Sequence, residues 1–173
     1  MVGAFSHLKI PEILRSSPSL LCHLVRCFEE ETLQWRPNLE RWSAAMVITH
    51  LAEAEGVCFR TRLIRTAREE SPLLERYDQW ACLRGKETFT VEPALDWFAA
   101  ERATTLRFLE DLSEEVLDRR CNHPELGMLT FANLLNEFAF HDMGHMRQIL
   151  ELCRSHAYYP GMGSWQKYYT VHP

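Results

Sequence analysis

The amino-acid sequence predicts an all-α protein, and three observations support that prediction. Apolar residues recur at helical spacing in four long stretches, and none of these alternates as a strand would. Proline, glycine and polar residues interrupt the pattern between the stretches. The chain has 173 residues, 46% of them hydrophobic, which is enough for a core without staples. We therefore expect one domain over residues 1–173, built as a four-helix bundle.

The first predicted helix follows a short helical turn. Residues 9–15 predict that turn, because proline is tolerated early in a helix and Pro11 stands there. Ser17 and Pro18 then have the form of an N-cap followed by proline at the first helical position. We expect the first long helix to run from Pro18 to Leu33.

The second predicted helix begins after Ser43, its N-cap, and runs to about Glu69. Its inward row contains residues at helical spacing: Val47, His50, Ala54, Val57, Thr61 and Ile64. A histidine, His50, therefore occupies a core position on this helix.

A long connection separates the second helix from the third. Residues 71–90 show no clear periodicity, and a connection of this length in a compact domain needs a structural reason. We expect it to run the length of the bundle, so that the third helix, from Val91 to Leu112, lies parallel to the second. Arg102 falls on the inward row of this third helix, although such an arginine more often extends its charge to solvent.

The last predicted helix follows a short helical turn at residues 113–117 and a loop at residues 122–128. It begins after Thr130, its N-cap, and runs to about Arg154. The tail, residues 157–173, holds five aromatic residues, which is unusual for a free terminus. We expect the tail to pack against the bundle or against a second subunit.

Composition and charge exclude some classes of function. The net charge is −5 and no run of Lys or Arg stands out, which argues against a nucleic-acid partner. No segment approaches the roughly 18 apolar residues of a membrane span, and the first residues lack the form of a signal peptide. The six cysteines form no CxxC pair, so we expect reduced and mostly buried thiols. These features predict a soluble cytoplasmic protein, and they are compatible with a small-molecule substrate.

Three histidines predict a metal site. His141 and His145 occupy core positions one turn apart on the last helix, and a buried polar group costs a few kcal/mol unless it is satisfied. Side chains at that spacing lie about 5–6 Å apart, so both imidazoles can reach one ion at about 2.1 Å. With His50, they would leave an ion with open positions, as in catalytic centres. Nitrogen ligands suit zinc, nickel, copper or iron. The alternative is a metal-free histidine cluster.

Two acids flank the histidine pair. Glu137 lies one turn before His141 and Asp142 directly follows it; either could orient an imidazole or act as a base, and an ordinary surface acid is the alternative for each. The spacing from His141 to His145 matches the zinc-protease motif HExxH with Asp in place of Glu, but no glutamate follows Glu151 to complete the ligand set. A di-iron carboxylate site is excluded because the chain lacks paired ExxH motifs.

Several short segments together resemble a known family. They are Trp35-Arg36-Pro37, Trp42-Ser43, Val47 to Leu51 with Glu53 and Glu55, Arg102, His123 to Gly127, Leu129 to Phe131, and His141 to His145. Over residues 15–156 the chain resembles the DinB-like (DinB/YfiT) superfamily of candidate metalloenzymes. The resemblance implies one ligand from the second helix and a His-x-x-x-His pair from the fourth, and His50, His141 and His145 fill these positions.

The resemblance also implies an up-down-down-up bundle, a divalent ion that is most often nickel or zinc, and a homodimer. Characterised members include transferases and isomerases that use small thiols such as bacillithiol, mycothiol or glutathione. We therefore expect a metal-dependent enzyme in which a substrate thiol attacks an electrophile, with Arg102 on a substrate carboxylate and Asp142 orienting a ligand. The alternative is a non-catalytic metal-binding or interaction protein of stress response. No catalytic residue is identified, and we expect the metal to be lost below about pH 6.

Overall fold

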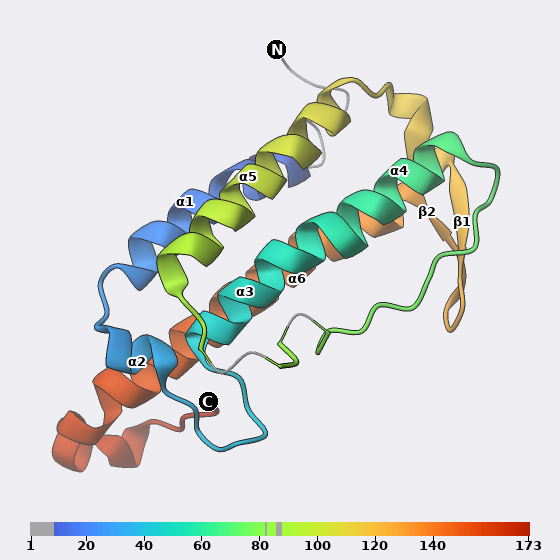
Figure 1. Cartoon of the computed structure of the whole chain (residues 1–173). Helices are drawn as coiled ribbons and strands as arrows, with labels where there is room; N and C mark the ends of the chain where they lie inside the picture. Colours follow the sequence, from blue (N-terminus) through green and yellow to red (C-terminus); the bar gives the residue numbers. More distant parts are fainter. Residues whose placement is uncertain (1–8, 82, 86–87) are drawn as a thin grey trace.

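The computed structural model describes residues 9–81, 83–85 and 88–173, and these form a bundle of four long helical segments (Figure 1). The helices are α1 (Ile10–Val25), α2 (Glu30–Gln34), α3 (Ala44–Ala54), a π-helix (Glu55–Arg60), α4 (Thr61–Arg68), α5 (Val91–Glu110) and α6 (Phe131–Ala157), with 3-10 helices at Glu114–Asp118 and Tyr159–Tyr168. The prediction of an all-α four-helix bundle is confirmed.

The long segments are α1, the continuous rod of α3, π-helix and α4, then α5, and then α6. In Figure 1, α1 and α6 run in one direction, whereas the α3–α4 rod and α5 run in the other. The connection between α4 and α5 returns along the bundle, from the end of α4 to the level at which α3 begins. This return explains why the connection is long although its described residues form no helix.

The first helix differs from the prediction. Helix α1 begins at Ile10 and continues through Pro18, so Ser17 is not an N-cap, and α2 is a separate short helix. Proline has no N–H for the carbonyl four residues earlier. That carbonyl, on Leu14, accepts hydrogen bonds from Ser17 Oγ (3.3 Å) and Arg102 Nη1 (2.6 Å) instead. A contact from another helix therefore satisfies the group that the proline leaves open.

The second rod contains a π-helix that the sequence analysis did not predict. Ser43 caps its start, as expected, and its Oγ accepts a hydrogen bond from a backbone N–H (3.2 Å). The π-helix at Glu55–Arg60 has more residues per turn than an α-helix and displaces the inward row. Val57, predicted to face the core, is 60% exposed, whereas Cys58 and Phe59 are buried.

A short β-hairpin replaces the predicted loop before α6. Strands β1 (Arg120–His123) and β2 (Gly127–Thr130) pair antiparallel, and Gly127 has the positive φ of 76° that favours glycine. Leu74 N in the long connection donates a hydrogen bond to Asn122 O in β1 (2.8 Å). The hairpin therefore anchors the start of the connection.

Helix α6 begins as predicted, because Thr130 and Asn133 form a reciprocal capping box. The tail after α6 returns to it: Arg154 donates to the carbonyl of Thr170 (3.1 Å), and His172 N donates to Glu151 Oε1 (2.7 Å). The aromatic side chains of the tail are nevertheless largely exposed, among them Tyr158, Trp165, Tyr168 and Tyr169. The tail thus contacts the bundle by its backbone more than by its rings.

The core consists of two apolar clusters, one toward each end of the bundle. Between them lie buried or half-buried polar residues from α1, the α3–α4 rod, α5 and α6: Ser17, His50, Glu55, Arg102, His141, Asp142 and His145. The candidate site belongs to this polar layer.

Five described cysteines are free thiols, of which Cys58, Cys121 and Cys153 are buried, while Cys82 lies outside the described residues. Within the described part of the chain, no helix combines the length and apolar character needed to cross a membrane.

Candidate metal centre

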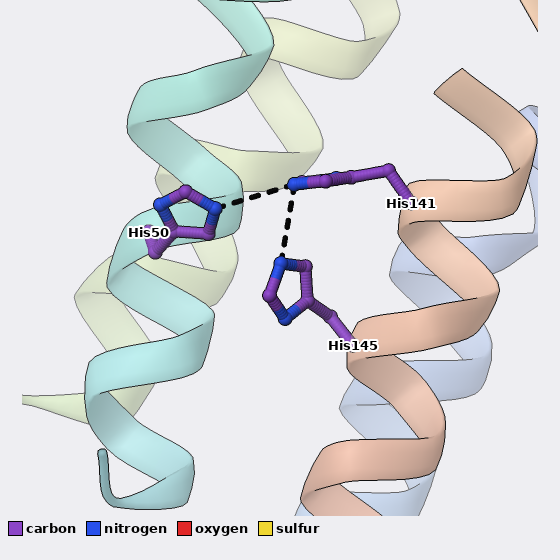
Figure 2. Close-up of side chains that lie close together, drawn as sticks. All are labelled: His50, His141 and His145. Atoms are coloured by element: carbon purple, nitrogen blue, oxygen red, sulfur yellow. Dashed lines mark hydrogen bonds between the residues drawn. The ribbon is translucent and has the colours of Figure 1, made fainter. Parts of the chain in front are cut away.

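The three histidines predicted as ligands meet between α3 and α6. His50 extends from α3 toward His141 and His145 on α6, as Figure 2 shows. His141 Nε2 lies 3.2 Å from His50 Nε2 and 3.1 Å from His145 Nε2. One nitrogen of each residue lies within 4.8 Å of the other two. The helical spacing therefore brings the pair together, and the packing of α3 on α6 adds the third.

The positions of the three nitrogens fit a shared cation. Two nitrogens that are each about 2.1 Å from one ion lie about 3.0–3.4 Å apart at adjacent corners of an octahedron or tetrahedron. The separations of 3.1 and 3.2 Å fall in this range. Hydrogen bonds alone satisfy the three nitrogens poorly, because Nε2 of His141 has one hydrogen or one lone pair to share between Nε2 of His50 and Nε2 of His145. The donor set consists of imidazoles alone, which suits several divalent transition metals.

Burial keeps the three imidazoles in the neutral form that binds metal. Burial, and after it charge on the neighbouring histidines, lowers the pKa of His50 to about 4 and of His141 to about 2. Burial also lowers the pKa of His145, against the opposing effect of its hydrogen bond to Gln148. Neutral histidine is the ligand form, so the free site is prepared for a cation near neutral pH.

The neighbours of His145 orient its ring. Its Nδ1 donates a hydrogen bond to Gln148 Oε1 (2.9 Å), which leaves the lone pair on Nε2, the atom that faces the other two histidines. The indole of Trp42 stacks nearly parallel to this ring, with centroids 6.4 Å apart, and also contacts the ring of His50 at 5.0 Å. The role of Gln148 depends on this side-chain geometry, which the sequence pattern did not predict.

The long connection orients His50. Tyr77 Oη lies 3.4 Å from His50 Nδ1 and donates a short hydrogen bond to Glu53, and the backbone of Gln79 also hydrogen-bonds His50. Partners on the outer nitrogen of a ligand histidine hold the ring in place and set its tautomer. Sequence analysis missed Tyr77 and Gln79, because the connection shows no periodicity that would place them near α3.

The outer nitrogen of His141 is different. Its Nδ1 is buried and has no hydrogen-bond partner among the described residues, and its ring packs against Phe59 with centroids 4.7 Å apart. This ring is therefore held by packing rather than by a polar partner. Phe59 itself stacks on Phe138 at 4.2 Å, so the π-helix supplies the apolar wall behind the site.

Arg102 lies in the core and does not reach a substrate. Only 1% of its surface is exposed, and it forms forked ion pairs with Glu55 (2.9 and 2.8 Å) and Asp142 (2.8 and 3.0 Å). Its Nη1 also contacts Leu14 O and Ser17 Oγ (2.6 and 2.7 Å). All five N–H donors of the guanidinium are engaged. The prediction that Arg102 binds a substrate carboxylate was therefore wrong, because its ion pairs with Glu55 and Asp142 stabilise the guanidinium in the core and leave it no free donor.

Asp142 also differs from its predicted role. It is 1% exposed and turns away from the histidine nitrogens into the polar layer, where its Oδ2 accepts a hydrogen bond from Ser17 (2.5 Å) besides the pairs with Arg102. It therefore does not orient an imidazole by direct hydrogen bonding. The 100° step between successive helical residues sends Asp142 and His141 in different directions. Glu55 and Ser17, its companions in the layer, were not predicted as functional residues.

A pocket opens beside the histidines along α6. Its volume is about 850 Å³, and it is lined by Arg41, Glu137, Phe140, His141, Gly144, His145, Arg147, Gln148, Glu151 and His172. This size accommodates a small molecule. Glu137, the second predicted acid, lies in the pocket wall, and partial desolvation raises the pKa of its carboxyl although the residue is exposed. The pocket thus joins two histidines to one candidate base.

Known proteins match most of this chain. Residues 13–149 match the family described as the DinB superfamily. A protein of Oceanobacillus iheyensis, named as the candidate metal-dependent hydrolase OB0782, is 29% identical over 139 residues, which cover 79% of this chain and 80% of that protein.

Two solved structures from Bacillus subtilis share the fold. YfiT, described as a candidate metal-dependent hydrolase with an unusual four-helix bundle topology, aligns with a TM-score of 0.78 and 22% identity over 90% of each chain. The DinB-like protein YjoA aligns with a TM-score of 0.56 and 18% identity over 95% of this chain and 96% of its own. At these identities the two structures establish the shared fold.

Proposed function

This chain belongs to the DinB superfamily, and from that membership we propose that it is a divalent-metal-dependent enzyme acting on a small molecule. His50, His141 and His145 would hold the ion. The observation that carries the proposal is the convergence of three neutral imidazole nitrogens, with separations of 3.1 and 3.2 Å, beside a pocket of about 850 Å³. Three protein ligands leave open positions for water or substrate.

We propose nickel or zinc as the ion, since imidazole nitrogen suits both. When bound, such an ion lowers the pKa of a coordinated water or thiol and so supplies a nucleophile at neutral pH. The protein's own contribution is to hold the three ring nitrogens in register through Gln148, Tyr77 and the packing of Trp42. Residues 1–173 would form the single domain that carries this site.

The nucleophile decides between two reaction classes. The relative from O. iheyensis is named as a candidate metal-dependent hydrolase, which supports water as the nucleophile. Transfer of a small cellular thiol to an electrophile is the second class that we propose. No cysteine lines the pocket among the described residues, so a sulfur nucleophile would have to arrive with a bound small thiol.

We propose Glu137 as the group that receives a proton from the nucleophile. Of the two acids in the pocket lining, Glu137 forms no ion pair with a described residue, whereas Glu151 binds Arg154 and the backbone of His172. A raised carboxyl pKa makes a better proton acceptor. Replacement by glutamine keeps the shape and removes this capacity.

Two measurements test the proposal. Elemental analysis of untagged protein should find nearly one nickel or zinc per chain. The second measurement is an activity screen with two arms, one with chromogenic esters and one with small thiols and an electrophile. A chelator should abolish the activity found in either arm. Turnover in the first arm assigns hydrolysis, and turnover in the second assigns thiol transfer. Metal-free protein of unchanged stability in chelator, or activity that survives metal removal, would refute the metal-dependent enzyme.

A non-catalytic metal-binding or interaction protein is the second candidate, and we propose that either form assembles as a homodimer. The supporting observation is apolar surface beside the pocket and on the tail: Phe140 is 80% exposed, Leu150 46% and Trp165 66%. Light scattering after gel filtration should give twice the chain mass of 20.3 kDa. A monomer that binds metal and shows no turnover in either arm would leave only a metal-binding role.

A further inference from the structure

Two guanidinium groups in the pocket have no bonded partner in the part of the chain that the structure describes. Arg41, from the turn before α3, and Arg147, from α6, line the pocket beside the three histidines. Both side chains are exposed, and neither makes a hydrogen bond or ion pair with any residue that the structure describes. By contrast, the pocket residue Glu151 is paired with Arg154, so an arginine close to the pocket can be paired.

The turn that carries Arg41 is braced. The guanidinium of Arg36 donates hydrogen bonds to the carbonyls of Leu39 and Arg41, the latter at 2.7 Å. Arg41 N donates to Asn38 O (3.2 Å), which closes the turn. The next residue, Trp42, packs on two of the site's histidine rings. The backbone of Arg41 is therefore fixed relative to the histidines, although its side chain bonds to none of the described residues.

The charges in the pocket favour an anion. Its lining contains two carboxylates, of which that of Glu151 is compensated by Arg154 and by a backbone N–H. The remaining fixed charges are those of Arg41, Arg147 and Glu137, which leave a net positive charge before any ion binds. A divalent cation at the three histidines would add to it. An anionic group entering this pocket would meet attraction from both sources.

We propose that Arg41 and Arg147 form a subsite for an oxyanion of the substrate, a carboxylate or a phosphate. The planar guanidinium matches both groups through two parallel N–H donors. The inference rests on the proposed function, because it assigns a substrate class to the same pocket: a small acidic molecule whose anion binds the arginines while its reacting group faces the histidines. The pocket volume of about 850 Å³ suits such a molecule.

Titration calorimetry at low ionic strength tests this subsite on the full chain loaded with zinc. Succinate and inorganic phosphate are the probes, and succinamide is the neutral comparison for succinate. Arg41→Gln and Arg147→Gln should each weaken binding of the preferred anion by about three- to tenfold, as expected for exposed charge-assisted contacts. Arg68→Gln is the matched control, because Arg68 is also exposed and unpartnered among the described residues but lies at the end of α4 and outside the pocket.

The outcomes separate this subsite from the metal site. Tighter binding of succinate than of phosphate assigns a carboxylate, and the reverse assigns a phosphate. Equal weakening by Arg68→Gln, or no anion binding by protein that holds zinc, overturns the subsite and leaves the metal site standing. The same titration on metal-free protein keeps the two tests independent. If the protein fails to bind added zinc but still binds the anion through both arginines, the subsite is supported and the proposed metal centre is refuted.

Discussion

Replacing Arg102 by methionine would remove the central group of the polar layer. The guanidinium forms forked pairs with Glu55 and Asp142 and also contacts the Leu14 carbonyl left open by Pro18. Methionine fills much of the same volume without a donor. Two carboxylates would then remain in a site where the arginine, Glu55 and Asp142 are each only 1% exposed.

The loss of stability should be large. Breaking a buried ion pair by removing one partner costs about 3–5 kcal/mol, and here two carboxylates lose the same cation, so we expect the upper end, about 5 kcal/mol. For a chain of this size, 1 kcal/mol shifts the melting temperature by about 2–4 °C, so the variant should melt about 10–20 °C lower. The total stability of a domain is about 5–15 kcal/mol, so the variant will be marginally folded.

The pH dependence gives this prediction a distinctive signature. Burial raises the pKa of Glu55 even with Arg102 beside it, and removing the cation should raise it further. A carboxyl whose folded-state pKa is raised destabilises the fold increasingly as the pH rises from the unfolded pKa to the folded pKa, and the effect vanishes below the unfolded pKa. The difference in stability between wild type and Arg102→Met should therefore shrink as the pH falls from 7 toward 5.

Thermal unfolding followed by circular dichroism at several pH values measures both quantities. Arg26→Met is the matched control, since Arg26 forms a forked pair with Glu92 on the surface, and its loss should leave the melting temperature nearly unchanged. A variant at Arg102 that melts with wild type at pH 7 would refute the reasoning. So would a deficit that does not change with pH, because it would point to packing rather than to unpaired charge.

Three further predictions concern the histidines. His141→Ala should reduce bound metal in untagged protein from nearly one equivalent to nearly none by elemental analysis, and full retention would exclude this residue as a ligand. Burial lowers the pKa of His50 to about 4 and of His141 to about 2, so metal should stay bound below pH 6, lower than expected from the sequence, and should leave as the pH approaches 4. The folding stability gained from the neutral imidazoles is likewise present above their unfolded pKa and is lost as the pH falls toward these two lowered pKa values. Metal content after dialysis across this range checks it, and release already at pH 6 would contradict the lowered pKa values. Tyr77→Phe should weaken metal binding by about tenfold in a chelator competition, with little change in fold, because Tyr77 contacts the outer nitrogen of His50. The control is Tyr168→Phe, which should have no effect because the side chain of Tyr168 is 79% exposed.

The features that the sequence determined are local ones. Helical periodicity placed α5 and α6 within a few residues of their ends, and the caps at Ser43 and Thr130 follow from hydrogen bonds that span three residues. His141 and His145 share a face because they are one turn apart. The DinB resemblance, now confirmed, added the partner from α3 to this pair.

Only the tertiary structure decided what the polar residues do. Arg102 was expected to bind a substrate carboxylate or to extend its charge to solvent. Instead, packing joins it to Glu55, 47 residues before it, and Asp142, 40 residues after it, in one network. Arg102 also donates a hydrogen bond to the carbonyl of Leu14, 88 residues away, and this bond allows α1 to continue through Pro18. Local patterns fix helices through bonds between near neighbours, whereas burial, pKa and ion pairing depend on groups that meet only after the helices have packed.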